Sequence, residues 1–82
     1  MVHRQSYGRL ADLLLCLSGN IFRSEIFLLD LTRKELAELA GMSTENVIRI
    51  LKQFQKDGLI SLTGKTFEII DRDGLRKICS IG

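Results

Sequence analysis

Four charged side chains recur at helical spacing between residues 43 and 57: Glu45, Arg49, Lys52 and Lys56. At about 100° per residue they fall on one side of a helix, and the opposite side is apolar. A guanidinium can pair with O6 and N7 of guanine, a carboxylate can accept from N4 of cytosine, and ammonium groups suit phosphate oxygens. This chemistry favours DNA as a ligand. A plain solvated surface also explains the face, with Glu45 and Arg49 as an i,i+4 ion pair worth about 0.2–0.5 kcal/mol.

The segment that carries these charges is predicted to be a helix that Ser43 caps and that runs to about Lys56. Asp57 and Gly58 then end it. Its second face is apolar and is expected to hold the helix against the rest of the domain. The residues of that face, within roughly 60° of one another, are Val47, Ile50, Leu51 and Phe54.

A shorter helix is predicted to precede the charged one, separated by a turn of about three residues. Thr32 and Glu35 form a capping box, in which the Thr32 hydroxyl accepts from the N3 amide and the Glu35 side chain reaches back to the N-cap amide. Gly41 ends this helix, because the chain must turn left-handed there. Its apolar face is expected to consist of Leu36, Leu39 and Ala40.

The remaining elements follow from the same kinds of pattern. Residues 59–62 and 66–70 predict a hairpin with a glycine-containing loop at 63–65. Asp71 or Asp73 is expected to cap a short last helix that carries Leu75 and Ile78.

At the other end of the chain, leucines at i, i+3, i+4 and i+7 predict a first helix from about Tyr7 to Leu17, with Ser6 as its N-cap and Gly19-Asn20 as its end. An irregular segment over 20–25 and a short, largely buried strand over 26–29 come next.

Two helices joined by a glycine turn and followed at once by a hairpin are the layout of a winged helix-turn-helix. We therefore expect a mainly α fold with a small antiparallel sheet. Residues 1–82 would form one domain, with the helix-turn-helix at about 32–57 and the wing at about 59–71. The second helix of such a unit enters the major groove N-terminus first. Base edges would then face Thr44, Glu45, Ile48 and Arg49. Phosphates would suit Thr32, Arg33, Ser43, Lys52 and Lys65.

The composition excludes fewer classes of function than these sequence patterns do. The chain has 82 residues, of which 45% are hydrophobic and 27% are charged, as in a small globular domain. Its net charge of +2 is only mildly basic and does not by itself indicate a nucleic-acid partner. No apolar run reaches the roughly 18 residues that a membrane-spanning helix needs. Most enzyme folds with a closed substrate pocket also need a longer chain.

The cysteines and the only histidine favour neither a disulfide scaffold nor a zinc site. Cys16 and Cys79 are too few and too far apart, and His3 lacks further histidines beside it. We expect reduced thiols packed in or near the core, which fits a cytoplasmic protein, and no metal or cofactor. Residues 10–17 loosely resemble a signal peptide, but Asp12 interrupts the apolar run and the helical spacing explains it better.

Three motifs in order carry a resemblance to a known family. They are Leu31-Thr32-Arg33-Lys34-Glu35-Leu36-Ala37, Gly41-Met42-Ser43-Thr44-Glu45-Asn46-Val47-Ile48-Arg49-Ile50-Leu51, and Gly58-Leu59-Ile60-Ser61 with Gly64-Lys65-Thr66. Together they resemble the C-terminal DNA-binding domain of the CRP/FNR family of bacterial transcription regulators. Arg9-Leu10-Ala11-Asp12-Leu13-Leu14 resembles the helix just before that domain. The resemblance covers about 75 of the 82 residues.

The resemblance implies that Glu45 and Arg49 contact bases in double-stranded DNA, in a half-site with a TTGA- or GTGA-like core. Thr44 stands where the cyclic-AMP receptor branch has an arginine, and Ile48 where the oxygen-regulator branch has a small polar residue. Ile48 then either contacts a thymine methyl or packs sideways. The family adds a β-roll sensor and a dimerisation helix, so the chain is either a fragment of a longer regulator, which we favour, or a stand-alone DNA-binding unit. The resemblance implies a homodimer for the full-length protein, with RNA polymerase as a candidate partner.

Two other classes of function are weighed against DNA binding. The first is a winged-helix module that binds proteins and not DNA, which the small net charge allows; basic potential away from residues 44–56 and the wing would favour it. The second is an enzyme, for which no Ser-His-Asp or Cys-His set can be assembled. Cys16 on the apolar side of its helix is expected to be core. We therefore expect no enzyme activity and no catalytic residue.

Overall fold

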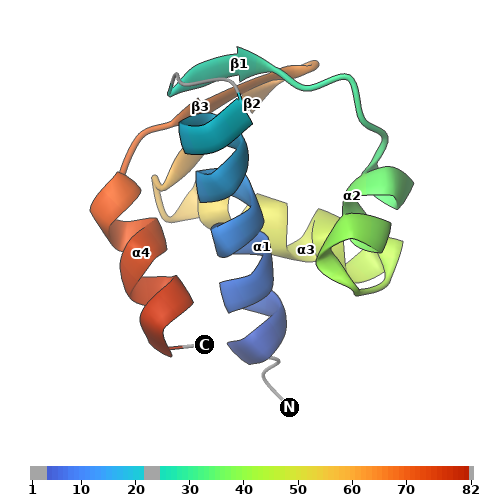
Figure 1. Cartoon of the computed structure of the whole chain (residues 1–82), viewed down its shortest axis with the longest axis horizontal. Coiled ribbons are helices and arrows are strands. Elements are labelled where there is room, and N and C mark those ends of the chain that lie inside the picture. The colour runs from blue at the N-terminus through green and yellow to red at the C-terminus, as the bar shows by residue number, and fades with distance from the viewer. Residues whose placement is uncertain (1–3, 22–24, 82) are drawn as a thin grey trace.

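The computed structural model of the chain describes residues 4–21 and 25–81. The expectations for His3 and for residues 22–24 of the irregular segment concern residues outside these ranges. The described part is mainly helical with a small antiparallel sheet, as predicted (Figure 1). Its elements are α1 (Arg4–Cys16), a π-helical turn η1 (Leu17–Ile21), β1 (Ile26–Leu28), α2 (Arg33–Ala40), α3 (Thr44–Lys56), β2 (Ile60–Thr63), β3 (Thr66–Ile69) and α4 (Arg72–Ile81).

The sheet adds a third strand to the predicted hairpin. The strand order is β1-β3-β2, and both pairs are antiparallel, so β1 and β2 are the edges. The pair Phe27 and Phe67 lies at matching positions of β1 and β3, with the rings stacked and their centroids 5.8 Å apart. The predicted burial of residues 26–29 holds for one face only: Phe27 and Leu29 are buried, whereas Ile26 and Leu28 are exposed, since successive side chains of a strand alternate between faces.

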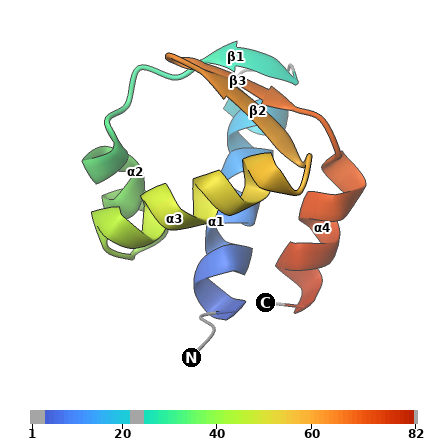
Figure 2. The same ribbon diagram turned by 180° about the vertical axis from the view of Figure 1, so that it is seen from behind.

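The helices pack below the sheet around one core. In Figure 2, α3 crosses in front of α1, while α4 stands beside α1 at the right of the view. The predicted stripe of α3 is buried in full, and Leu36 and Ala40 of α2 meet it as expected. Leu39 was predicted to join them but is 61% exposed. It lies on the edge of α2 that faces α1, where a groove keeps it in contact with solvent.

The helical segment at the start of the chain extends past the predicted Tyr7–Leu17 at both ends. Helix α1 begins at Arg4, so Ser6 lies inside it and is not its N-cap; α1 ends at Cys16, and the π-helical turn η1 carries the helical segment past Gly19. A tertiary contact explains the extension at the C-terminal end. The buried Ser18 hydroxyl donates to the carbonyl of Leu15 (3.1 Å) and accepts from Nη2 of Arg72 at the start of α4 (2.9 Å). A hydrogen bond across 54 residues cannot be seen in local periodicity.

Helix α4 begins where the sheet ends. Of the two predicted caps the structure uses Asp71, whose carboxylate accepts from the amide of Gly74 (2.9 Å). Leu75 is fully buried and Ile78 packs against the core, as predicted. The half-buried Cys79 thiol lies 3.7 Å from the carbonyl of Gly8. Burial raises the pKa of this thiol, and the negative charge of Asp12 raises it further, so the thiol stays protonated at neutral pH.

Gly74 is a position where added volume should destabilise the fold. A Cβ there would lie 2.5 Å from Cδ2 of the buried Leu59 and 2.7 Å from Oδ2 of Asp71. Alanine ordinarily gains about 1 kcal/mol over glycine in a helix, but overpacking costs about 1–3 kcal/mol. We expect Gly74→Ala to lose about 1 kcal/mol, which lowers Tm by about 4–8 °C in a domain of this size.

Thermal unfolding followed by circular dichroism measures this loss. Gly19→Ala is the matched control, because a Cβ at that helical glycine meets nothing within 4 Å. Its Tm should stay the same or rise, because alanine favours the helix and its Cβ meets no neighbour there. An increase in Tm for Gly74→Ala would contradict the close packing of α4 on Leu59.

Candidate nucleic-acid interface

The helix-turn-helix is built from local hydrogen bonds that match the predicted capping box. The Thr32 hydroxyl accepts from the amide of Glu35 (3.1 Å), and Oε1 of Glu35 accepts from the amide of Thr32 (2.9 Å). At the other end of α2, Gly41 has φ 70°. The amides of Gly41 and Met42 there bond to the last turn of α2, which forms a Schellman motif. The turn therefore fixes where α3 starts relative to α2.

Helix α3 starts at the predicted cap. The Ser43 hydroxyl accepts from the amide of Asn46 (3.2 Å), and the backbone carbonyl of Ser43 accepts from the amide of Val47 (3.1 Å). At the far end, Oδ1 of Asp57 accepts from Nε2 of Gln53 (3.0 Å). Because the Ser43 oxygen is used as an acceptor, its O–H stays able to donate to a phosphate. The same holds for the Thr32 hydroxyl at the start of α2.

The solvent face of α3 carries the side chains that were predicted to contact DNA. Glu45, Ile48, Arg49 and Lys52 are exposed, and Thr44 is half-buried. Among the described residues Glu45 and Arg49 form no ion pair, so the guanidinium of Arg49 is open to another partner. The four apolar residues of the opposite face anchor the helix, and the whole N-terminal half of the outer face remains accessible.

The tip of the wing is a two-residue turn, Gly64-Lys65, between β2 and β3, and Gly64 has φ 60°. It lies at the end of the sheet opposite to the start of α4 and next to the loop that leads from β1 into α2 (Figure 1). There the Nζ atom of Lys65 lies 2.9 Å from Oδ1 of Asp30. Lys65, predicted to contact a phosphate, is therefore exposed but is already paired with the carboxylate of Asp30.

Arg33 takes a different position from the other predicted phosphate ligands. Its guanidinium lies over the ring of Phe67 on β3, 5.7 Å from the centroid, and the residue is half-buried. Such a cation–π contact adds about 0.5–1 kcal/mol at exposed sites. Thr32 and Arg33 thus lie at the start of α2, and Lys65 lies beside Asp30, two residues before Thr32. Thr44, Glu45, Ile48 and Arg49 gather along α3, with Ser43 at its N-cap.

Sequence reasoning missed two residues near this surface. Asp30 was assigned no role, although it holds the wing lysine. Arg9 of α1 was placed only within the motif before the domain, and its Nη1 atom lies 3.5 Å from the carbonyl of Gly41 in the turn. Charge and spacing gave no signal for either, because each contact joins residues more than 30 positions apart. Pairing of β1 with β3 is what brings Asp30 to Lys65.

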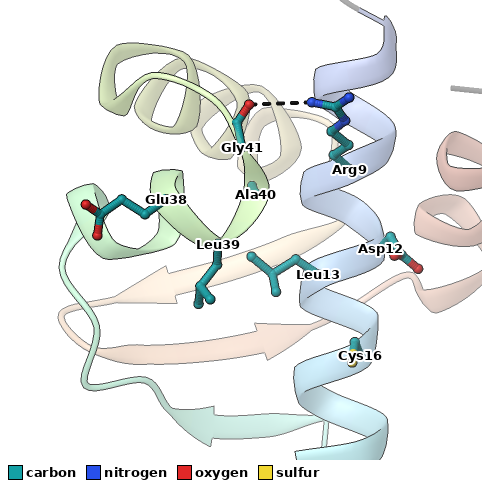
Figure 3. A pocket seen from close by; sticks show the side chains of 8 residues that line it. All are labelled: Arg9, Asp12, Leu13, Cys16, Glu38, Leu39, Ala40 and Gly41. Carbon is teal, nitrogen blue, oxygen red and sulfur yellow. Dashed lines mark hydrogen bonds between the residues drawn. The ribbon is translucent and has the colours of Figure 1, made fainter.

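A groove of about 450 Å³ lies between α1 and α2, away from the outer face of α3. Arg9, Leu13, Glu38 and Leu39 line it, and Leu13 and Leu39 point toward each other across it (Figure 3). Cys16 also lines it and is exposed, so the prediction that Cys16 is core was wrong. Its position one turn beyond Asp12, on the groove side of α1, keeps it outside the packed interior.

Comparisons with known proteins agree on one family. Residues 8–78 match the family model described as the Crp-like helix-turn-helix domain. The transcriptional activator protein anr of Pseudomonas aeruginosa is 36% identical over 67 residues, which are 77% of this chain and 28% of that protein. The anaerobic regulatory protein of Haemophilus influenzae is 39% identical over 58 residues, which are 71% of this chain and 23% of that protein. The chain thus spans less than a third of the length of these relatives.

Solved structures agree on the fold. The catabolite activator protein of Thermus thermophilus superposes with a TM-score of 0.76 and 29% identity, over 94% of this chain and 35% of that one. FixK2 of Bradyrhizobium japonicum gives a TM-score of 0.82 at 22% identity, over 89% of this chain and 37% of that one, which speaks for the fold alone. Within the described residues no helix is both long and apolar enough to cross a lipid bilayer.

Proposed function

The chain belongs to the Crp-like helix-turn-helix domain family, and we propose that its residues bind double-stranded DNA as part of a transcription regulator. A domain of this family is a DNA-binding unit and not an enzyme. We place α3 in the major groove, with α2 across the sugar–phosphate backbone and the wing beside it. The observation that carries this proposal is the accessible N-terminal half of the outer face of α3, together with the open guanidinium of Arg49.

In this arrangement the side chains divide into two groups. Arg49 pairs with O6 and N7 of a guanine and Glu45 accepts from N4 of a cytosine, while Thr44 and Ile48 flank them. A carboxylate facing a polyanion is unfavourable unless it contacts a base, and this supports the assignment of Glu45. The side chains that contact phosphates fix the register of the helix on the duplex. They are Thr32, Arg33, Ser43, Lys52 and Lys65.

We further propose that the chain acts within a longer, homodimeric and cytoplasmic regulator that also contacts RNA polymerase. The relatives are about four times as long as their matched part, which supports a larger whole. A dimer binds two half-sites about one helical turn apart. One domain alone binds one half-site, so its affinity should be weak and should fall steeply with salt.

Titration of duplex DNA tests the proposed function. Fluorescence anisotropy with an inverted TTGA- or GTGA-like repeat, compared with a scrambled duplex of the same composition, should give tighter binding to the repeat. Equal and salt-independent values for both duplexes, or no binding at all, would instead favour a protein-interaction module.

Lys65→Ala should weaken binding to every sequence alike. Loss of one phosphate contact makes the slope of log K against log salt shallower by at most about 0.9, and by less if Asp30 already offsets the charge. The measurement is the same titration at several salt concentrations. Arg76→Ala is the control, because it removes an exposed cation from α4, far from the wing. A loss confined to the repeat would show that Lys65 takes part in base recognition.

A further inference from the structure

The contact between Asp30 and Lys65 is set by the backbone and not only by two flexible side chains. The amide of Leu29 donates to the carbonyl of Lys65 (2.8 Å), and Leu28 pairs with Thr66 in the sheet. Asp30 therefore follows directly on a residue bonded to the wing turn. Both side chains are exposed, with 73% of the Lys65 and 91% of the Asp30 side chain accessible to solvent.

A carboxylate in this place competes with DNA for the same cation. The Lys65 ammonium has three donors, and one of them lies 2.9 Å from Oδ1 of Asp30. A phosphate that approaches Lys65 must share it with Asp30 and also meets the negative charge of Asp30 itself. The pair as a whole is neutral, so it releases fewer counterions on binding than a lysine alone.

We propose that Asp30 is a positioning residue that limits the contribution of the wing to DNA affinity. By holding Lys65 and offsetting its charge, it weakens the sequence-independent part of binding, while base contacts of α3 remain unchanged. The inference rests on the proposed function and adds a residue to it. The charge pattern of α3 and the wing does not predict this role for Asp30.

The size of the effect follows from the exposure of the pair. Exposed ion pairs contribute little, and removal of one charge is expected to change Kd by about two- to fivefold. Asp30→Asn keeps the shape of the side chain and removes its charge. We expect it to tighten binding by that factor on repeat and scrambled duplexes alike, and to make the salt slope steeper by up to about 0.9.

The experiment compares five variants with the wild type by anisotropy titration from low to physiological salt, and one of them is Lys65→Ala, the reference for the double variant. Asp30→Asn is measured alone and in the Lys65→Ala background, and Asp30→Glu retains the charge and should bind like the wild type. Asp73→Asn is the matched control: it makes the same change of net charge on the exposed first turn of α4, at the opposite end of the sheet from the wing.

Support for the proposal is tighter binding by Asp30→Asn that exceeds that of Asp73→Asn and shrinks when Lys65 is alanine. Equal tightening in both backgrounds would overturn it, because Asp30 would then act through its own charge alone. Weaker binding would also overturn it, because Asp30 would then hold Lys65 ready for phosphate. If the wild type prefers the repeat but Asp30→Asn and Asp73→Asn bind with equal affinity, only the role of Asp30 is refuted. Wild-type protein that binds neither duplex refutes the proposed function and this role with it.

Discussion

Replacement of Phe54 by alanine is expected to remove a large part of the stability of the domain. Phe54 is fully buried on the inner face of α3 and meets the ring of Tyr7 edge-on, with centroids 6.0 Å apart. Truncation of a buried phenylalanine costs about 3–5 kcal/mol, and a chain of this size has about 4–12 kcal/mol in total. Chemical denaturation should show a midpoint that falls steeply, and DNA binding should fall with it, because α3 loses its support.

Phe54→Leu is the control that separates lost volume from a lost aromatic contact. Leucine keeps much of the apolar side chain, so it should lose less stability than alanine does. Near wild-type stability in Phe54→Ala would contradict the burial of this face of α3. A folded Phe54→Ala protein that still binds DNA fully would show that α3 is held in place by its other contacts.

Arg49→Ala is expected to relax base discrimination with little change in stability. A bidentate arginine–guanine pair is worth about 1–3 kcal/mol against the wrong base, or about 5- to 150-fold in relative affinity. Arg49 is exposed and, among the described residues, has no ion-pair partner, so the free energy of unfolding should change by no more than about 0.5 kcal/mol. The measurement is the ratio of Kd values for the repeat and for repeats with the G·C pair replaced.

Arg49→Lys sharpens this test, since it keeps the charge and removes the planar fork. It should lose discrimination much as alanine does and keep more of the affinity for scrambled DNA. Lys52→Ala is the comparison on the same helix face and should weaken all duplexes alike. If Arg49→Ala also weakens all duplexes by one common factor, Arg49 contacts a phosphate and not a base.

The sequence predicted the helix-turn-helix and the outer face of α3 because local interactions set both. The Thr32–Glu35 capping box, the Ser43 cap and the left-handed Gly41 each act within a few residues. The apolar period of α3 sorted its two faces without knowledge of what they pack against. The roles of Glu45 and Arg49 stay predictions, because the free domain shows only that these side chains are accessible.

Tertiary contacts decided what the sequence predicted wrongly or missed. The bond from Arg72 to Ser18 carries α1 into η1 past its predicted end, and alternation in β1 exposes Ile26 and Leu28. An apolar pattern shows that a residue type suits burial but not whether a neighbour covers it. Pairing of β1 with β3 brings Asp30 beside Lys65 across 35 residues of chain, and no local rule encodes that contact. The sequence alone thus determined which face of α3 is turned outward, and the pairing of strands in the sheet decided that Lys65 lies beside Asp30.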